Sequence, residues 1–121
     1  MADYDVRPRD ERLRTAAFSG GNQQKLICAR EMARGPKVLL VGQPTRGVDV
    51  GAIEQIHARL RALKEAGTAI LLVSVELDEI LALADRILVM VDGRFTGELD
   101  RAAATERSLG LLMAGVQGAA A

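Results

Sequence analysis

The stretch KVLLVGQ at residues 37–43 decides the fold of this chain. Its apolar residues 38–41 are consecutive rather than alternating with polar ones, which is typical of a strand buried on both faces of a parallel sheet. A second apolar run covers residues 68–73. Between them, residues 50–66 place apolar side chains three and four positions apart, as an amphipathic helix does. Two strands joined through a helix predict an α/β fold with a mostly parallel sheet and flanking helices.

The sequence after residue 73 predicts a hairpin between two further helices. A short helix is expected at residues 77–84, and a strand follows at residues 86–91. The dipeptide Asp92-Gly93 signals a two-residue turn, so residues 94–98 are expected to pair antiparallel with that strand as a C-terminal β-hairpin. A last helix is expected at residues 105–113, and a disordered tail at residues 117–121.

The sequence before residue 37 predicts one helix and an irregular lead-in. The helix is expected at residues 21–33, and Gly35 and Pro36 are expected to end it. Residues 1–17 are polar and charged without a period, so we expect them to be irregular and to lie outside the core. The apolar stripe of the helix is expected to consist of Leu26, Ile27, Ala29, Met32 and Ala33.

Composition and charge limit the class of protein. The 121 residues are 49% hydrophobic with 16 basic and 16 acidic side chains, which predicts one soluble domain or a part of one. Balanced charge argues against a nucleic-acid surface. No apolar run approaches the roughly 20 residues of a membrane-spanning helix, and the first residues lack the apolar core of a secretory signal, which predicts a cytosolic location. The single cysteine, Cys28, is expected to be a small apolar residue on its helix.

The run FSGGNQQK at residues 18–25 has the composition of an anion-binding helix start. The first N–H groups of a helix have no acceptor within it, the helix dipole adds partial positive charge there, and two glycines let a phosphate approach the backbone. Ser19 can cap the helix or donate its hydroxyl to a phosphate oxygen. Taken alone, the tripeptide at residues 19–21 is more typical of an ordinary loop and N-cap before an amphipathic helix.

Three further motifs follow in a fixed order: PTRGVD at residues 44–49, VSVELDE at residues 73–79 and ADRILVM at residues 84–90. With FSGGNQQK, they give residues 18–116 a resemblance to ATP-binding cassette (ABC) ATPases, in the form found in sugar and nucleoside importers. The resemblance implies a partial P-loop NTPase domain. It also implies that Ser19, Gly20, Gly21, Asn22 and Gln23 contact the γ-phosphate of ATP held by another nucleotide-binding domain. Asp49 matches the aspartate of the family's D-loop, which crosses the dimer interface, and its position also suits it to cap the following helix.

The sequence departs from the family pattern where hydrolysis would need it most. No G-x-x-x-x-G-K-[ST] phosphate loop is present. The family's aspartate and glutamate after the first strand are replaced by Gly42 and Gln43, and a histidine near the γ-phosphate is replaced by Val75. These departures resemble the second, degenerate nucleotide-binding domain of tandem importer ATPases, of which this chain would be the C-terminal part. They predict no catalytic residue and no metal site, with ATP and Mg²⁺ bound only at a composite site shared with another domain.

Two functions follow from this resemblance. In the first, the chain belongs to an ABC importer for nucleosides or simple sugars. It donates FSGGNQQK at residues 18–25, here called the signature run, to a composite ATP site. Its partners would be the N-terminal nucleotide-binding half and the membrane permease subunits, and it would lie in the cytoplasm at the inner face of the plasma membrane without inserting into it. In the second, the chain is a non-catalytic binding or regulatory fragment that docks on intact ABC ATPases. Whether it takes part in ATP hydrolysis stays open between the two.

Overall fold

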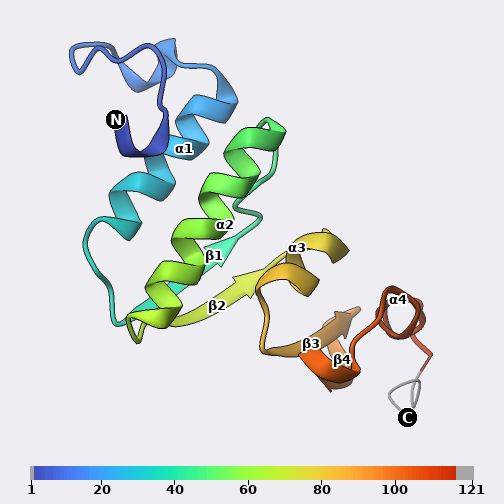
Figure 1. The fold of residues 1–121 in the computed structure, drawn as a ribbon. Helices are drawn as coiled ribbons and strands as arrows, with labels where there is room; N and C mark the ends of the chain where they lie inside the picture. The colour runs from blue at the N-terminus through green and yellow to red at the C-terminus, as the bar shows by residue number, and fades with distance from the viewer. Residues whose placement is uncertain (1, 117–121) are drawn as a thin grey trace. The chain divides into compact units, whose positions relative to one another are not determined.

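The computed structural model describes residues 2–116, which form two compact units divided after Val73. The expected disordered tail at residues 117–121 lies outside the described residues. The first unit contains two short 3₁₀ helices, two α-helices and two strands: η1 (Ala2–Tyr4), η2 (Thr15–Ala17), α1 (Gly20–Met32), β1 (Val38–Gly42), α2 (Val50–Glu65) and β2 (Ala69–Val73) (Figure 1). The second contains α3 (Leu77–Leu83), β3 (Arg86–Val91), β4 (Arg94–Asp100), η3 (Arg101–Ala103) and α4 (Glu106–Met113).

The helices of the first unit begin and end at the residues that the sequence marks. The Ser19 hydroxyl accepts the Asn22 N–H at the start of α1. The Asp49 carboxylate accepts the Ala52 N–H at the start of α2 at 2.9 Å. After α2, Gly67 adopts a φ of +98°, a left-handed conformation that glycine reaches without a steric penalty. The predicted bounds of both helices are therefore confirmed to within a residue.

β1 and β2 pair in parallel, from Val38 opposite Ala69 to Gly42 opposite Val73. Among residues 2–116 this sheet has two strands, and β3 pairs with β4 in a separate antiparallel sheet. The mixed α/β class is therefore confirmed, with a small parallel sheet and the predicted antiparallel hairpin. Its turn residues Asp92 and Gly93 both have positive φ, as a tight hairpin turn requires.

The β1–β2 sheet is covered on one face and open on the other. Leu39, Val41, Ile70 and Leu72 are buried or half-buried, and the alternate positions are exposed. Leu40 is 72% exposed and Leu71 is 57% exposed, and they are register partners on the open face. The expectation of strands buried on both faces is therefore wrong for the described residues, because the helices packed together here, α1 and α2, leave this face uncovered.

The buried face of α1 also differs from the predicted stripe. Lys25, Cys28 and Met32 are the buried residues of this helix, while Ile27 is exposed. Of the predicted stripe only Met32 is buried, because the helix is turned so that Lys25 faces inward. The lead-in contributes to the core as well, since Val6 is fully buried, contrary to the expectation that residues 1–17 lie outside it.

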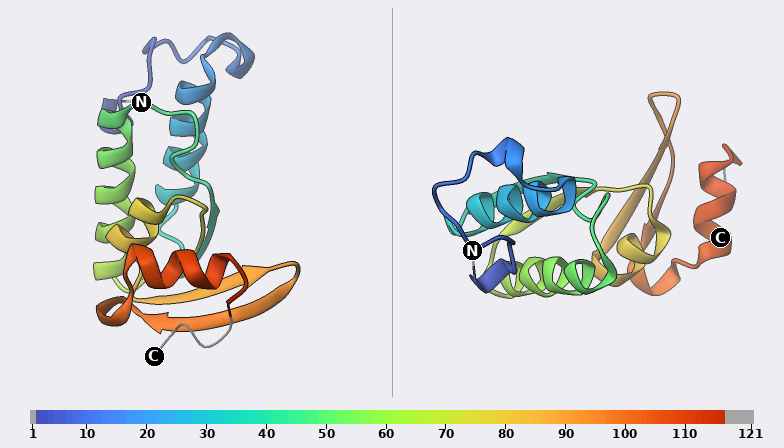
Figure 2. Two further views of the ribbon diagram at one scale, coloured as in Figure 1. Left: turned by 90° about the vertical axis from the view of Figure 1, so that its right-hand side faces the viewer. Right: turned by 90° about the horizontal axis from the view of Figure 1, so that it is seen from above.

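The core of the second unit lies between the β3–β4 hairpin and α4 (Figure 2). Leu109 and Leu112 of α4 are among its most deeply buried side chains. The Thr96 hydroxyl of β4 donates to the Leu112 carbonyl at 2.9 Å, and so ties the end of α4 to the hairpin. A Cβ atom built on Gly97 would lie 2.6 Å from a methyl carbon of Leu112, so this glycine leaves room for the leucine side chain.

Candidate functional site

The start of α1 is open to solvent. Ser19 and Gly20 are exposed, and a Cβ atom built on Gly20 would meet nothing within 4 Å. The Ser19 oxygen accepts the Asn22 side-chain N–H at 3.0 Å and the Asn22 backbone N–H at 3.4 Å. A serine hydroxyl has one proton to donate besides its two acceptor positions. The arrangement therefore leaves that proton for an incoming anion, together with the N–H groups of Gly20 and Gly21 at the start of α1.

The three amide side chains after Gly21 are engaged within the chain. The Asn22 side-chain oxygen accepts the Arg7 backbone N–H at 2.9 Å, and the Gln23 side chain donates to the Phe18 carbonyl at 2.9 Å. The Gln24 side chain donates to the Pro44 carbonyl at 3.0 Å. Asn22 and Gln24 thus hold the run at residues 18–25 against neighbouring segments, and Gln23 bonds within the run. The predicted contacts of Asn22 and Gln23 with ATP stay predictions.

The loop at residues 43–49 connects β1 to α2 and lies beside the start of α1. Gln43 has a φ of +49°, a left-handed conformation that costs a non-glycine residue roughly 1–2 kcal/mol. Its N–H donates to the Val73 carbonyl at 2.8 Å and its carbonyl accepts the Arg46 N–H at 3.2 Å, and these two bonds hold the turn. A Cβ atom on Gly21 would lie 3.1 Å from the Gly47 carbonyl oxygen, so α1 approaches this loop closely.

The positions that the sequence marks as degenerate lie at the end of β1 and after β2. Gly42 is the last residue of β1, and a Cβ atom there would meet nothing within 4 Å. Gln43 directly follows it, so an acidic pair at these positions would stand at the carboxyl end of the strand. Val75 lies in the second unit, in the loop before α3, and is exposed. Within residues 2–116, no group of three or more His, Cys, Asp or Glu side chains could hold a metal ion.

Lys25 is the residue of this region that sequence reasoning missed. Its ammonium lies 3.4 Å from Asp49 Oδ2, and its side chain is 9% exposed against 70% for Asp49. The pKa of Asp49 lies below its ordinary value of 3.8, first because the carboxylate accepts the Ala52 N–H and further because of the Lys25 charge; partial burial opposes this. The available signal was spacing, since Lys25 stands three residues before Cys28 and seven before Met32, on the same helix face.

Acid is expected to weaken folding partly through Asp49. Because folding holds the pKa of Asp49 below that of the unfolded chain, the carboxylate stabilises the fold above the ordinary pKa, and this contribution is lost as the pH falls through the lower, folded value. Asp49→Asn keeps an acceptor for the Ala52 N–H but does not titrate. Urea unfolding at pH 7 and at about pH 3 should therefore show a smaller acid loss of stability in this variant than in the wild type. Equal losses would contradict the assignment.

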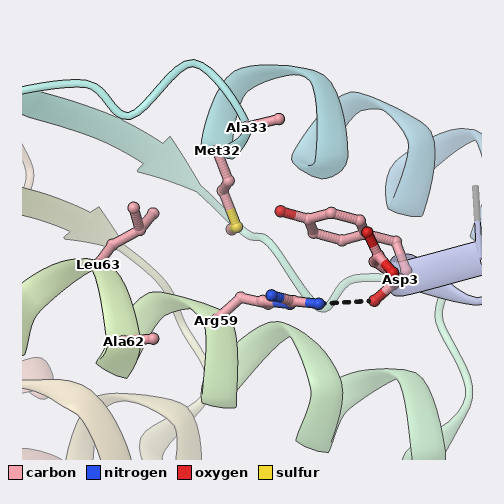
Figure 3. Close-up of a pocket in the computed structure, with 7 residues that line it drawn as sticks. Asp3, Met32, Ala33, Arg59, Ala62 and Leu63 are labelled. Carbon is pink, nitrogen blue, oxygen red and sulfur yellow. Dashed lines mark hydrogen bonds between the residues drawn. The ribbon is translucent and has the colours of Figure 1, made fainter.

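A separate recess of about 330 Å³ lies between η1, the end of α1 and the later part of α2 (Figure 3). Arg59 extends into it from α2 and donates to the Asp3 carbonyl at 3.1 Å. Its guanidinium also lies 5.0 Å from the centre of the Tyr4 ring. The recess contains none of the residues predicted for a site, and its cation is already engaged by the lead-in.

Comparisons with known proteins show which proteins the chain is similar to. No family model matches the chain. The guanosine import ATP-binding protein NupO of Bacillus subtilis is 51% identical over 115 residues, which are 95% of this chain and 22% of that protein. The homologues of this chain are ATP-binding proteins of sugar and nucleoside importers. The resemblance seen in the sequence is confirmed.

Other importer ATP-binding proteins match to the same degree. The nucleoside import ATP-binding protein NupA of Lactococcus lactis is 50% identical over 115 residues, 95% of this chain and 23% of that protein. The ribose import ATP-binding protein RbsA 2 of Streptomyces avermitilis is 50% identical over 106 residues, 88% of this chain and 20% of that protein. The chain thus spans about a fifth of the length of these importer proteins. No helix within residues 2–116 is both long and apolar enough to cross a membrane.

The residues of this chain fit the phosphate of ATP better than they fit Mg²⁺. The start of α1 fits a phosphate, because it combines an open hydroxyl with the N–H groups of a first helical turn. The end of β1 does not fit Mg²⁺, which is bound in proteins mainly through carboxylates and phosphates. Gly42 offers no side-chain ligand there, and Gln43 offers a neutral amide.

Proposed function

We propose that this chain is the signature-bearing C-terminal part of a second, degenerate nucleotide-binding domain in an ABC importer for nucleosides or simple sugars. Ser19, Gly20 and Gly21 would donate to the γ-phosphate of an ATP whose other contacts come from the N-terminal nucleotide-binding half. The observation that carries the proposal is the open start of α1. There the N-cap Ser19 retains a hydroxyl proton to donate, and Gly20 leaves space for a phosphate to approach the backbone.

The proposed partners and location follow from the same role. A donor of the signature run needs a second nucleotide-binding domain to supply the phosphate loop, and an importer needs permease subunits to carry the solute across the membrane. We therefore place the chain in the cytoplasm, held at the inner face of the membrane by the permease. Asp49, on the loop before α2, is proposed to face the partner domain, because 70% of its side chain is exposed.

The test is ATP turnover by the purified chain, alone and mixed with a separately expressed N-terminal nucleotide-binding half of an importer ATPase. Turnover that appears only in the mixture would support the proposal. A mixture in which the chain binds the half but never raises turnover would favour the non-catalytic docking fragment instead. Tight ATP binding by the chain alone would contradict both, because it would require a complete phosphate site within these residues.

Replacing Gln43 by glutamate is not expected to restore hydrolysis at the site built on β1. The new carboxylate could act on water, but Gly42 would still offer no carboxylate for Mg²⁺. The measurement is ATP turnover of the complete importer ATPase after inactivation of its other site. The matched comparison is the double variant Gly42→Asp with Gln43→Glu, for which the structure leaves space around the Gly42 Cα. Full recovery by the single change would contradict the assigned role of Gly42.

A further inference from the structure

Lys25 joins three segments of the first unit at one ammonium group. Its side chain is almost completely buried, although it belongs to the second turn of α1. The ammonium lies 3.4 Å from Asp49 Oδ2 and also donates to the Asp5 backbone carbonyl at 3.4 Å. A buried ammonium is costly unless it is paired, so the loss of either partner would leave charge in a poorly solvated place. The position of α1 is therefore tied to the loop that ends at Asp49.

Two neighbouring contacts reinforce this attachment. The Gln24 side chain donates to the Pro44 carbonyl at 3.0 Å, near the beginning of the loop at residues 43–49. Gly21 approaches the Gly47 carbonyl so closely that an added Cβ would lie 3.1 Å from its oxygen. With Lys25 at Asp49, α1 contacts this loop near its beginning, along its course and at its end. These contacts hold the signature run against the loop at three places.

The two carboxylate oxygens of Asp49 serve different partners. Oδ1 accepts the Ala52 N–H and so fixes the carboxylate at the start of α2, and Oδ2 faces Lys25. The Asp49 side chain is nevertheless mostly exposed, whereas Lys25 is enclosed. A group that contacts Asp49 from outside would therefore act on α1 through an ion pair with one accessible end and one buried end.

We propose that Lys25 is a positioning residue that couples the phosphate-binding start of α1 to the exposed carboxylate of Asp49. The inference rests on the proposed function, since it assigns how two parts of that site are held in register. When a partner domain closes on Asp49, Lys25 keeps Ser19 and Gly20 at the place where the phosphate is met. Lys25 itself touches no nucleotide in this proposal.

The experiment uses the mixture of this chain with the N-terminal nucleotide-binding half. Lys25→Met keeps the length and apolar stem of the side chain but removes the charge, and Asp49→Asn removes the charge from the exposed side while leaving an acceptor for the helix cap. We expect each to lower the kcat for ATP by about tenfold, as the loss of one charge-assisted contact in the closed state would. The KM for ATP should change little, because ATP is held first by the other domain.

Three comparisons separate positioning from a merely structural role. Lys25→Arg should recover most of the kcat, and Lys37→Met, on an exposed lysine, should leave it unchanged. The double variant Lys25→Met with Asp49→Asn should be no worse than either single variant, because both remove the same interaction. Additive losses would overturn the coupling. Circular dichroism of each variant checks folding. If Lys25→Met does not fold, Asp49→Asn still removes the ion pair by a change at an exposed side chain.

A measurement without nucleotide distinguishes failure of the inference from failure of the proposed function. NMR titration of the isolated chain should show a higher Asp49 pKa in Lys25→Met than in the wild type, and no such rise in Lys37→Met. An unchanged pKa would overturn the inference, whatever the turnover. Normal kcat in Lys25→Met beside lost turnover in Ser19→Arg would overturn the coupling alone. Absence of turnover with the wild-type chain would overturn the proposed function and the coupling with it.

Discussion

Replacing Ser19 by arginine is expected to abolish ATP turnover in the mixture with an N-terminal nucleotide-binding half, and solute uptake by the complete transporter. Ser19 is exposed at the start of α1, so an arginine side chain can be accommodated at the surface without entering the core. It would fill the space in front of Gly20 that the γ-phosphate is proposed to occupy, and it would remove the donated hydroxyl. The loss should exceed 100-fold, as for removal of a donor at a developing charge.

Ser19→Arg also removes the helix cap, which typically costs about 1 kcal/mol of stability. Ser19→Ala is the matched control, because it loses the cap and the hydroxyl but leaves the approach to Gly20 open. Its turnover should lie between that of the wild type and that of Ser19→Arg, and both variants should keep the wild-type circular dichroism. Normal turnover by a folded Ser19→Arg chain would be incompatible with a composite site at α1.

Replacing Leu112 by alanine is expected to lower the free energy of unfolding of the second unit by about 2–5 kcal/mol. Leu112 is completely buried, and it fills the space over Gly97 where no side chain stands. Alanine would leave a cavity between α4 and β4. Because the Thr96 hydroxyl already bonds these two elements together, they could close the cavity only in part. Denaturant unfolding followed by circular dichroism measures the loss.

Leu111→Ala provides the comparison, because it makes the same chemical change one residue earlier in α4. Leu111 is 39% exposed, so its truncation removes less buried surface and should cost clearly less, about 1 kcal/mol. Similar losses in the two variants would mean that α4 does not present Leu112 to the hairpin in solution.

The bounds of the helices could be predicted from the sequence because local chemistry sets them. Ser19 and Asp49 cap the helices that follow them, and the turn at Asp92 needs no distant contact to form. The same holds for the start of α4, where Thr105 and Ser108 bond reciprocally. Caps and turns depend on a few adjacent residues, so their patterns can be read in one chain.

Burial could not be predicted as well, because it depends on partners far along the chain. The apolar pattern of α1 does not include Lys25, yet Asp49, 24 residues later, compensates the charge of its buried ammonium. Leu40 and Leu71 lie in apolar runs that are typical of strands buried on both faces, yet both are exposed. An apolar side chain does not specify which segment covers it. The site at the start of α1 therefore stays a prediction, and the ion pair behind it could not be predicted from the local pattern.

The two glycines of the signature run are under different steric constraints. At Gly21 the Gly47 carbonyl lies close to where a side chain would begin, so folding alone disfavours a larger residue. At Gly20 the surroundings are empty, and the fold by itself would accept a substitution. Under the proposed function, the approach of the γ-phosphate is what would favour glycine at position 20. In a related protein that had lost this role, we expect substitutions at position 20 before substitutions at position 21.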